Sequence, residues 1–264
     1  MAERIFHFAP RDAAEAARIF EACTRLRSGG RPVRAAILES PPDWARGLSL
    51  PHASVSLDEL ESLGPGAGAD VIVSHAAMAG IEEISKADYL AVVGGGARFG
   101  DFLDAVSRAG LRFPHEPDVG TRGMTIAELL MAGTRFPADE RFGRLREWVL
   151  SLELAIPKGE VIRTGSRAVK DVTGYDIAGF VIGSGGRCGV IARMTLRLLP
   201  LSLVRETSGG AFGGEAPGAS AGGGDFGAGA PDAPATKDPR SRAVLDEIRE
   251  RVFKVFDPEG IMSP

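Results

Sequence analysis

The 264-residue sequence predicts a fold that mixes α-helices and β-strands. Three observations carry this prediction. A strand, a helix and a second strand follow one another at the start of the chain, strands alternate with glycine-rich turns and helices over residues 89–200, and an amphipathic helix follows a segment rich in Gly, Ala and Pro. Apolar periods near two and near 3.6 residues therefore both occur, as in proteins that combine the two kinds of element.

The opening segment has the pattern of a β-α-β unit. Residues 4–9 alternate in polarity, and Asp12 is a typical residue at the N-cap of a helix. Apolar residues at helical spacing predict a helix over 13–26, and the turn at 28–30 separates it from a second strand over 32–38. The length of this helix suits a crossover between two parallel strands.

The following elements are predicted from the same signals. We expect helices over 56–63, 99–109 and 125–132, and strands over 71–74, 89–93, 148–156, 161–164 and 190–199. Residues 39–50 are expected to be loop, since Pro41-Pro42 excludes regular structure, and residues 112–120 to be irregular. Residues 157–160 form a hairpin-like turn between two of the strands.

Residues 208–236 differ from the rest of the chain in composition. They consist of Gly, Ala, Pro and Ser with two large apolar residues, Phe212 and Phe226. Such a segment buries too little apolar surface to offset the entropy of ordering it, so we expect a flexible linker. Residues 241–256 then predict one helix with an apolar face, and residues 257–264 a tail.

The composition excludes several classes of protein. A net charge of -4 disfavours a nucleic-acid surface, which is normally basic. No apolar run approaches the roughly 18 residues of a membrane span, and the N-terminus lacks the apolar core of a signal peptide. Cys23 and Cys188 are expected to be reduced thiols. We expect a cytoplasmic protein without direct membrane insertion, whose membrane association, where it occurs, is made through partners.

For most candidate catalytic or ligand-binding motifs, a structural role is the better interpretation. Gly94-Gly95-Gly96 stands between a strand and a helix, but its spacing is not that of a phosphate-binding loop, so a tight turn is expected. The four histidines lack metal-ligand spacing, and Glu82-Glu83 is expected to be a solvated face. No nucleophile elbow and no convincing Cys-His arrangement for nucleophilic catalysis is present.

The stretch from residue 168 to 191, AVKDVTGYDIAGFVIGSGGRCGVI, is the strongest signal. Glycine has no Cβ, so a glycine cluster lets another backbone or a flat ligand approach closely. Gly183, Gly185, Gly186 and Gly189 before an apolar strand therefore fit either the wall of a planar cofactor site or a tightly packed junction. Spacing alone leaves both interpretations open.

Five segments resemble one known family. Residues 170–177 (KDVTGYDI) and 183–191 (GSGGRCGVI) are similar to its paired motifs K-N-V-x-G-Y-D-L and G-S-E-G-T-L-G-V-I. Residues 158–165 resemble its hairpin, residues 91–117 its strand, glycine turn and helix, and residues 256–264 its terminal F-D-P-x-G-I-L-N-P. The family is that of FAD-linked oxidases with the vanillyl-alcohol oxidase or p-cresol methylhydroxylase (PCMH) type of fold, particularly the glycolate oxidase and D-lactate dehydrogenase branch.

The resemblance implies an α+β FAD-binding domain of two subdomains that lacks the family's substrate cap domain. Residues 1–88 would be a small β-α-β subdomain and 89–200 a larger sheet subdomain. Residues 201–240 would be a linker in place of the cap, and residues 241–264 the C-terminal helix and tail. The helix would pack back on the first subdomain, and its apolar face would need a partner, which implies a hetero-oligomer.

The cofactor that the resemblance implies is FAD, held largely through the backbone. Residues 183–191 would contact the flavin and residues 117–126 would flank the diphosphate. The implied contact residues are Pro117, Gly120, Thr125, Ile126, Gly174, Tyr175, Asp176, Gly183, Ser184, Gly186, Gly189, Val190 and Ile191. No metal ligand and no catalytic residue is implied.

Three departures from the family bear on whether FAD is retained. The diphosphate loop R-G-G-G-T-x is replaced by Arg34-Ala35-Ala36-Ile37-Leu38-Glu39, and the turn T-I-G-G by Thr125-Ile126-Ala127-Glu128. Gly185 stands where the family has an acidic residue. A carboxylate at 128 would face two phosphate charges, and like charges at close range cost energy.

Two functions remain open. The first is an FAD-binding accessory subunit of a glycolate oxidase or D-lactate dehydrogenase-like complex, which assists oxidation of a 2-hydroxy acid beside a full-length FAD-binding subunit and an iron-sulfur subunit. The second is a flavin-free homologue that acts as a structural or assembly subunit for the full-length flavoprotein. The isolated chain is not expected to be catalytic in either case. An independent nucleotide-binding module is disfavoured, because the sequence offers no intact phosphate site.

Overall fold

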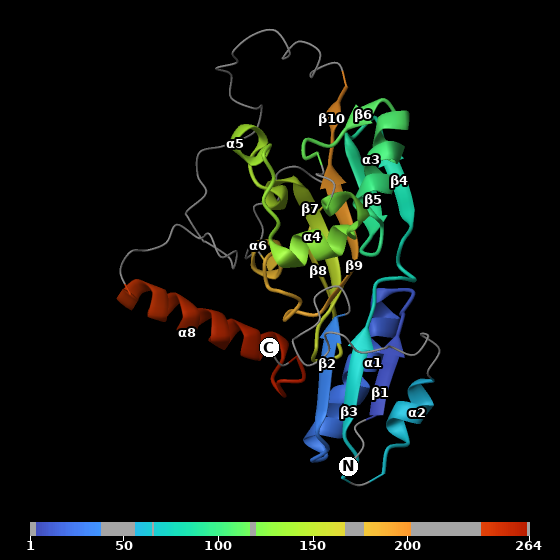
Figure 1. The fold of residues 1–264 in the computed structure, drawn as a ribbon, viewed down its shortest axis with the longest axis vertical. Coiled ribbons are helices and arrows are strands. Elements are labelled where there is room, and N and C mark those ends of the chain that lie inside the picture. Colours follow the sequence, from blue (N-terminus) through green and yellow to red (C-terminus); the bar gives the residue numbers. More distant parts are fainter. Residues whose placement is uncertain are drawn as a thin grey trace.

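The computed structural model describes residues 4–37, 56–64, 66–116, 120–166, 177–201 and 239–262. Its strands form two sheets and a two-stranded pair (Figure 1). The small sheet has the order β1-β3-β2, and the large sheet has the order β4-β5-β9-β7-β8. The small sheet lies at one end of the elongated molecule, and the large sheet with its helices occupies the rest (Figure 1).

The small sheet is parallel throughout. It is formed by β1 (Arg4–Phe8), β3 (Ala69–Val73) and β2 (Val33–Ile37). Helix α1 (Ala13–Ser28) makes the crossover, and the Asp12 carboxylate accepts a hydrogen bond from Glu15 N at 2.8 Å, which satisfies one of the unpaired amides of its first turn. The expected β-α-β opening with its Asp12 cap is therefore confirmed. The short helix α2 (Leu57–Glu61) precedes β3.

The large sheet is antiparallel. Its strands are β4 (Ile81–Ser85), β5 (Leu90–Gly94), β9 (Val190–Arg197), β7 (Val149–Ala155) and β8 (Val161–Gly165). The sequence predicts all of these except β4, for which Glu82-Glu83 was interpreted as a solvated face. β4 is an edge strand, and such edges often carry charged residues.

Short helices surround the large sheet (Figure 1). They are α3 (Phe99–Arg108), α4 (Ile126–Ala132), α5 (Asp139–Phe142) and α6 (Ile177–Val181), with 3-10 turns η2 (Thr121–Gly123) and η3 (Leu145–Trp148). The strands β6 (Leu111–Arg112) and β10 (Leu199–Pro200) form the antiparallel pair. α3 and α4 match the predicted helices, whereas α5, α6 and the 3-10 turns were not predicted, because each is too short to show a clear apolar period.

The C-terminal segment returns to the small sheet. Helix α8 (Pro239–Phe256) extends away from the body at its N-terminal end, and its C-terminal end leads into residues that lie beside β2 (Figure 1). Ala35 N donates to Ile261 O at 2.7 Å, and the Asp257 carboxylate accepts from Ile261 N and Met262 N. Ile261 is fully buried. The tail thus covers the outer edge of β2.

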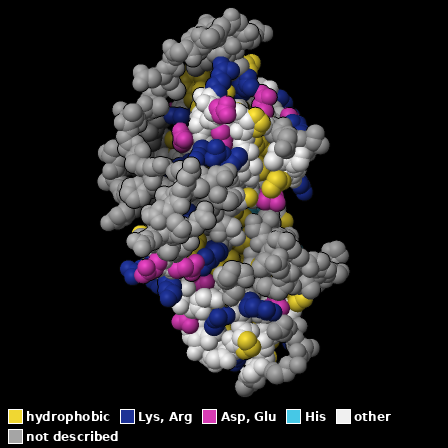
Figure 2. Space-filling view, turned by 60° about the vertical axis from the view of Figure 1, so that its left-hand side comes forward, with side chains coloured by type: hydrophobic (Ala, Val, Ile, Leu, Met, Phe, Trp, Pro, Cys, Tyr) yellow, Lys and Arg dark blue, Asp and Glu magenta, His cyan; other side chains and the backbone are white. Residues whose placement is uncertain are grey.

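Within the described ranges, no helix combines the length and the apolar character that crossing a membrane requires. On the face shown in Figure 2, the described basic and acidic side chains are interspersed. The expected loop over 39–50 and the expected linker over 208–236 lie outside the described residues.

Candidate functional site

The glycine triplet at the end of β5 is a point of close backbone approach. A Cβ on Gly94, Gly95 or Gly96 would lie 2.0, 1.9 and 2.0 Å from the carbonyl oxygens of Met78, Ile191 and His75, respectively. The three amides donate in the same order to the carbonyl oxygens of Gly80, Ala192 and Met78, at 2.8 to 3.0 Å. The triplet is therefore a packed turn whose donors are already used, as the sequence favoured.

Helix α4 begins directly beside this triplet. The amides of its first two residues, Ile126 and Ala127, donate to Ala97 O at 3.0 Å and Gly95 O at 3.1 Å. Glu128 N donates to Thr125 Oγ1 at 3.1 Å, and the Glu128 carboxylate accepts from Thr125 N at 3.3 Å, which completes a capping box. The predicted contact residues Thr125 and Ile126 thus lie together, with their amides bonded inside the protein.

The glycine-rich loop at 183–189 is packed against the other end of α4. Gly183 N donates to Leu130 O at 2.8 Å and Gly185 N to Met131 O at 2.9 Å. These bonds satisfy carbonyl groups in the last turn of the helix, which have no partner within it. Gly189 has φ of 112°, and a Cβ there would lie 2.0 Å from Ala155 O on β7.

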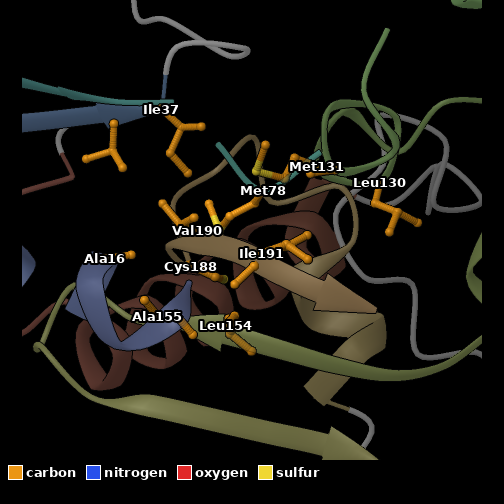
Figure 3. Close-up of a cluster of buried hydrophobic side chains, with 14 of the residues drawn as sticks. Ala16, Ile37, Met78, Leu130, Met131, Leu154, Ala155, Cys188, Val190 and Ile191 are labelled. Carbon is orange, nitrogen blue, oxygen red and sulfur yellow. The ribbon is translucent and has the colours of Figure 1, made fainter. Parts of the chain in front are cut away.

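An apolar cluster joins this loop to the small sheet. Figure 3 shows Ile37 from β2, Val190 and Ile191 from β9, Met131 from α4 and Met78 gathered in one place. The cluster is buried, with Ile37 1% exposed and Val190 and Ile191 0% exposed. A Cβ on Gly186 would lie 3.3 Å from Ile37 Cδ1 and 3.7 Å from Met131 Sδ.

Helix α8 lies on the outer side of the same loop. Arg187 forms two hydrogen bonds with the Glu250 carboxylate, at 2.7 and 3.1 Å, and its guanidinium lies 3.8 Å from the centroid of the Phe253 ring. A pocket of about 280 Å³ is lined by Gly183 and Ser184 of the loop, by Phe180 and by α8. The hydrogen bond from Arg187 lowers the pKa of Glu250.

The remaining predicted contact residues are not all placed by the structure. Gly120 precedes η2 and lies on the surface. Pro117, Gly174, Tyr175 and Asp176 lie outside the described residues, as do Leu38 and Glu39 of the altered diphosphate loop. Of the predicted set, the structure therefore places Thr125 and Ile126 at the start of α4 and the loop at 183–189 against the other end of this helix.

A buried acid-base pair that the sequence did not predict lies elsewhere among the described residues. His115 is 0% exposed and stands among Phe113, Phe136 and Trp148. Its Nε2 lies 3.0 Å from Gly143 O and 3.3 Å from Asp139 Oδ1. Burial lowers the pKa of His115, and the neighbouring carbonyl and carboxylate oppose this change. A lone histidine gives no sequence signal for such a pair.

The described residues hold no cluster of three or more His, Cys, Asp or Glu side chains that is suited to a metal ion. Both cysteines are free and buried, and burial raises the pKa of each thiol to about 12. Such thiols are inert toward nucleophilic chemistry near neutral pH.

Residues 60–165 match the sequence model of an FAD binding domain. The chain is 30% identical over 149 residues to the mitochondrial D-lactate dehydrogenase [cytochrome] of Arabidopsis thaliana, which covers 56% of this chain and 25% of that protein. It is 32% identical over 130 residues to glycolate oxidase subunit GlcD of Bacillus subtilis, covering 48% of this chain and 27% of the relative. It is 31% identical over 109 residues to glycolate oxidase subunit GlcE of Escherichia coli, covering 39% of this chain and 31% of the relative.

The fold has counterparts among solved structures. Alkyldihydroxyacetonephosphate synthase matches with a TM-score of 0.51 and 14% sequence identity over 74% of this chain and 31% of the other. At this identity, the likeness shows the arrangement of helices and strands and nothing further. The chain spans between 25% and 31% of the length of the three relatives named above.

The described residues do not fit the predicted way of holding FAD. A cofactor diphosphate is usually bound by free backbone amides at a helix N-terminus or in a glycine-rich turn. Here the amides at the start of α4 and in the Gly94–Gly96 turn donate to protein atoms. The sequence relationships are nevertheless consistent with one another: the chain fits the FAD-linked oxidase family, and FAD is the cofactor that the family model and the relatives support.

Proposed function

We propose that this chain is an accessory subunit of an FAD-linked oxidoreductase complex that oxidises a 2-hydroxy acid such as glycolate or D-lactate. Catalysis would reside in a full-length FAD-binding subunit, and an iron-sulfur subunit would accept the electrons. The substrate class comes from the relatives, which are named as D-lactate dehydrogenases and glycolate oxidase subunits.

The observation that carries the proposal is how the FAD domain is completed. The tail that resembles the terminal segment of the family packs on β2, with Ala35 N bonded to Ile261 O. Only residues 201–238 lie between β10 and α8, where the family would insert a cap domain that binds substrate. A chain with the FAD domain and the terminal segment but little room for a cap suits a role beside a full-length subunit.

Two further features support a subunit role. Ile248 and Val255 on α8 are 51% and 71% exposed and, seven residues apart, lie on the same face of the helix, where a partner subunit would cover both. The pair of His115 with Asp139 is buried among aromatic rings, where a substrate has no access. We therefore assign no catalytic acid or base to this chain.

The experiment is a reconstitution with the full-length FAD-linked oxidase subunit of the same organism. Each chain is purified alone and after co-expression, and oxidation of glycolate and of D-lactate is followed with an artificial electron acceptor. We expect co-elution in size-exclusion chromatography and no activity of this chain alone. Turnover by the isolated chain, or separate elution together with unchanged activity of the full-length subunit, would overturn the proposal.

A further inference from the structure

We infer that this chain closes its own flavin site with its own backbone and side chains. In the complex, FAD would then be carried by the full-length partner and not by this chain. The inference rests on the proposed function only for the place of the flavin in the complex. Three parts of the described structure close the site: the end of β2, the start of α4 and the wall formed by residues 183–191.

The end of β2 occupies the first of these places. Ala35, Ala36 and Ile37 stand where the resembled loop has three glycines, and they are strand residues with exposures of 1%, 3% and 1%. Ala35 N is bonded to Ile261 O of the C-terminal tail. A glycine-rich loop binds phosphate through free amides, so a strand whose edge is already covered has lost this capacity.

The one basic residue kept from that loop is also engaged. Arg34 Nε and Nη2 donate to the two carboxylate oxygens of Asp70 at 2.8 and 3.0 Å. The Asp70 side chain is 7% exposed and the Arg34 side chain 35%, so this bidentate pair is partly buried. A guanidinium paired in this way is neutralised by its own carboxylate and is poorly placed to balance a diphosphate.

The start of α4 is closed in the same sense. Its first three amides and the amide of Thr125 are bonded to Ala97 O, Gly95 O, Thr125 Oγ1 and the Glu128 carboxylate. A phosphate would have to break these bonds while lying beside the charge of Glu128. A helix start binds anions through its unpaired amide donors and the positive end of its dipole. Here the amides donate to protein atoms, and the Glu128 carboxylate lies at the positive end.

The wall at 183–191 faces side chains where the resemblance places a flavin. The side chains of Ile37 and Met131 pack against Gly186: a Cβ on this glycine would lie 3.3 Å from Ile37 Cδ1 and 3.7 Å from Met131 Sδ. Val190 and Ile191 are fully buried in the same cluster (Figure 3). A planar ring can enter only if this close-packed cluster opens, because interiors of this kind contain few voids larger than a water molecule.

The test is flavin binding by the chain alone and in the complex. FAD is titrated into the purified chain while flavin fluorescence and the melting temperature are recorded, and bound flavin is released by denaturation and counted. We expect a colourless chain, no fluorescence change and no thermal shift at 100 µM FAD. Flavin bound at about one per isolated chain would overturn the inference.

Flavin counted in the complex gives the second readout. One flavin per pair of subunits supports the inference, and two would contradict it. Ile37→Ala serves as a check on the apolar cluster: we expect a lower melting temperature that added FAD does not restore. Restoration by FAD would mean that Ile37 borders an open site. Failure to assemble with the full-length subunit would count against the proposed function and leave the flavin titration of the isolated chain valid.

Discussion

The glycine triplet at 94–96 and the glycine-rich loop at 183–189 look alike in sequence but use glycine for different reasons. None of the three triplet residues has a positive φ, and each is needed because a carbonyl oxygen lies about 2 Å from where a Cβ would be. In the loop, Gly183, Gly185, Gly186 and Gly189 all have positive φ. The first region needs space, and the second mainly needs a backbone conformation that side chains disfavour.

The two regions also differ in what holds them. The triplet is fixed by backbone bonds between β5, β9 and the residues around Met78. The loop has backbone bonds to α4 and, in addition, the contacts of Arg187 with Glu250 and Phe253 on α8. We therefore expect a substitution in the triplet to destabilise the whole fold. In the loop, we expect different substitutions to remove different contacts, with effects on stability that can be measured one at a time.

The largest effect is expected from Gly95→Ala. The new Cβ would meet Ile191 O at 1.9 Å where the end of β5 lies beside the start of β9, so the two strands must separate there. We expect a loss of about 4 kcal/mol or more in the free energy of unfolding, or failure to fold, as measured by urea denaturation. Gly80→Ala is the matched control, since nothing lies within 4 Å of its Cβ, and it should change stability by less than about 0.5 kcal/mol. Equal effects of both variants would contradict the close-approach explanation.

Within the loop, Gly189→Ala and Gly185→Ala separate space from conformation. Gly189 has both a positive φ and a carbonyl at 2.0 Å, whereas Gly185 has φ of 63° and open space. We expect about 1–2 kcal/mol for Gly185→Ala, from the left-handed conformation alone, and clearly more for Gly189→Ala. Gly185→Asn should recover part of the loss, because asparagine tolerates this conformation. An Asn variant no better than the Ala variant would show that conformation is not what the position requires.

A smaller effect is expected from Arg187→Met. The ion pair with Glu250 is partly exposed, and such pairs contribute about 1 kcal/mol or less, so global stability should barely change. The end of α8 should instead exchange its amide hydrogens faster. Because Arg187 lowers the pKa of Glu250, this contact should be complete above the usual pKa of glutamate and be lost as pH falls through the lowered value. Arg251→Met, which removes a pair within α8, should leave exchange in the loop unchanged.

The smallest expected effect concerns His115, which belongs to neither region and serves as a reference. Its pKa in the folded protein is lowered by burial, so the unfolded chain binds a proton more readily. Stability is therefore expected to be complete above the usual histidine pKa near 6.5 and to decline as pH falls below it. Melting temperatures between pH 5 and 8 measure this, and the slope should flatten in His115→Gln. A slope unchanged by this substitution would assign it to other groups.

Local signals in the sequence account for much of the fold. The Asp12 cap, the apolar period of α1 and the alternating strands around residues 149–165 each depend on neighbours along the chain, and each was predicted. The capping box of α4 is also a local signal, Thr125 with Glu128, although its consequence was missed. The same four residues were interpreted as a damaged diphosphate turn, whereas the structure shows a completed helix start.

Contacts between distant residues had no such signal. Nothing near Ile37 in the sequence indicates that it packs against Gly186, and nothing near Ala35 indicates Ile261. β4 was missed because a two-residue acidic run obscures a strand on the edge of a sheet. The candidate site was therefore predictable as a set of segments, while the state of its hydrogen-bond donors was not.

The bond between Ala35 and Ile261 has a consequence for how the protein is made. The small sheet is assembled from β1, β2 and β3, all near the N-terminus, yet the edge of β2 is covered by residues translated more than 200 positions later. A ribosome would thus release the large sheet before the small one is complete. During that interval the edge of β2 is available to other strands, and a chaperone or the partner subunit present at synthesis would have its greatest effect at this stage.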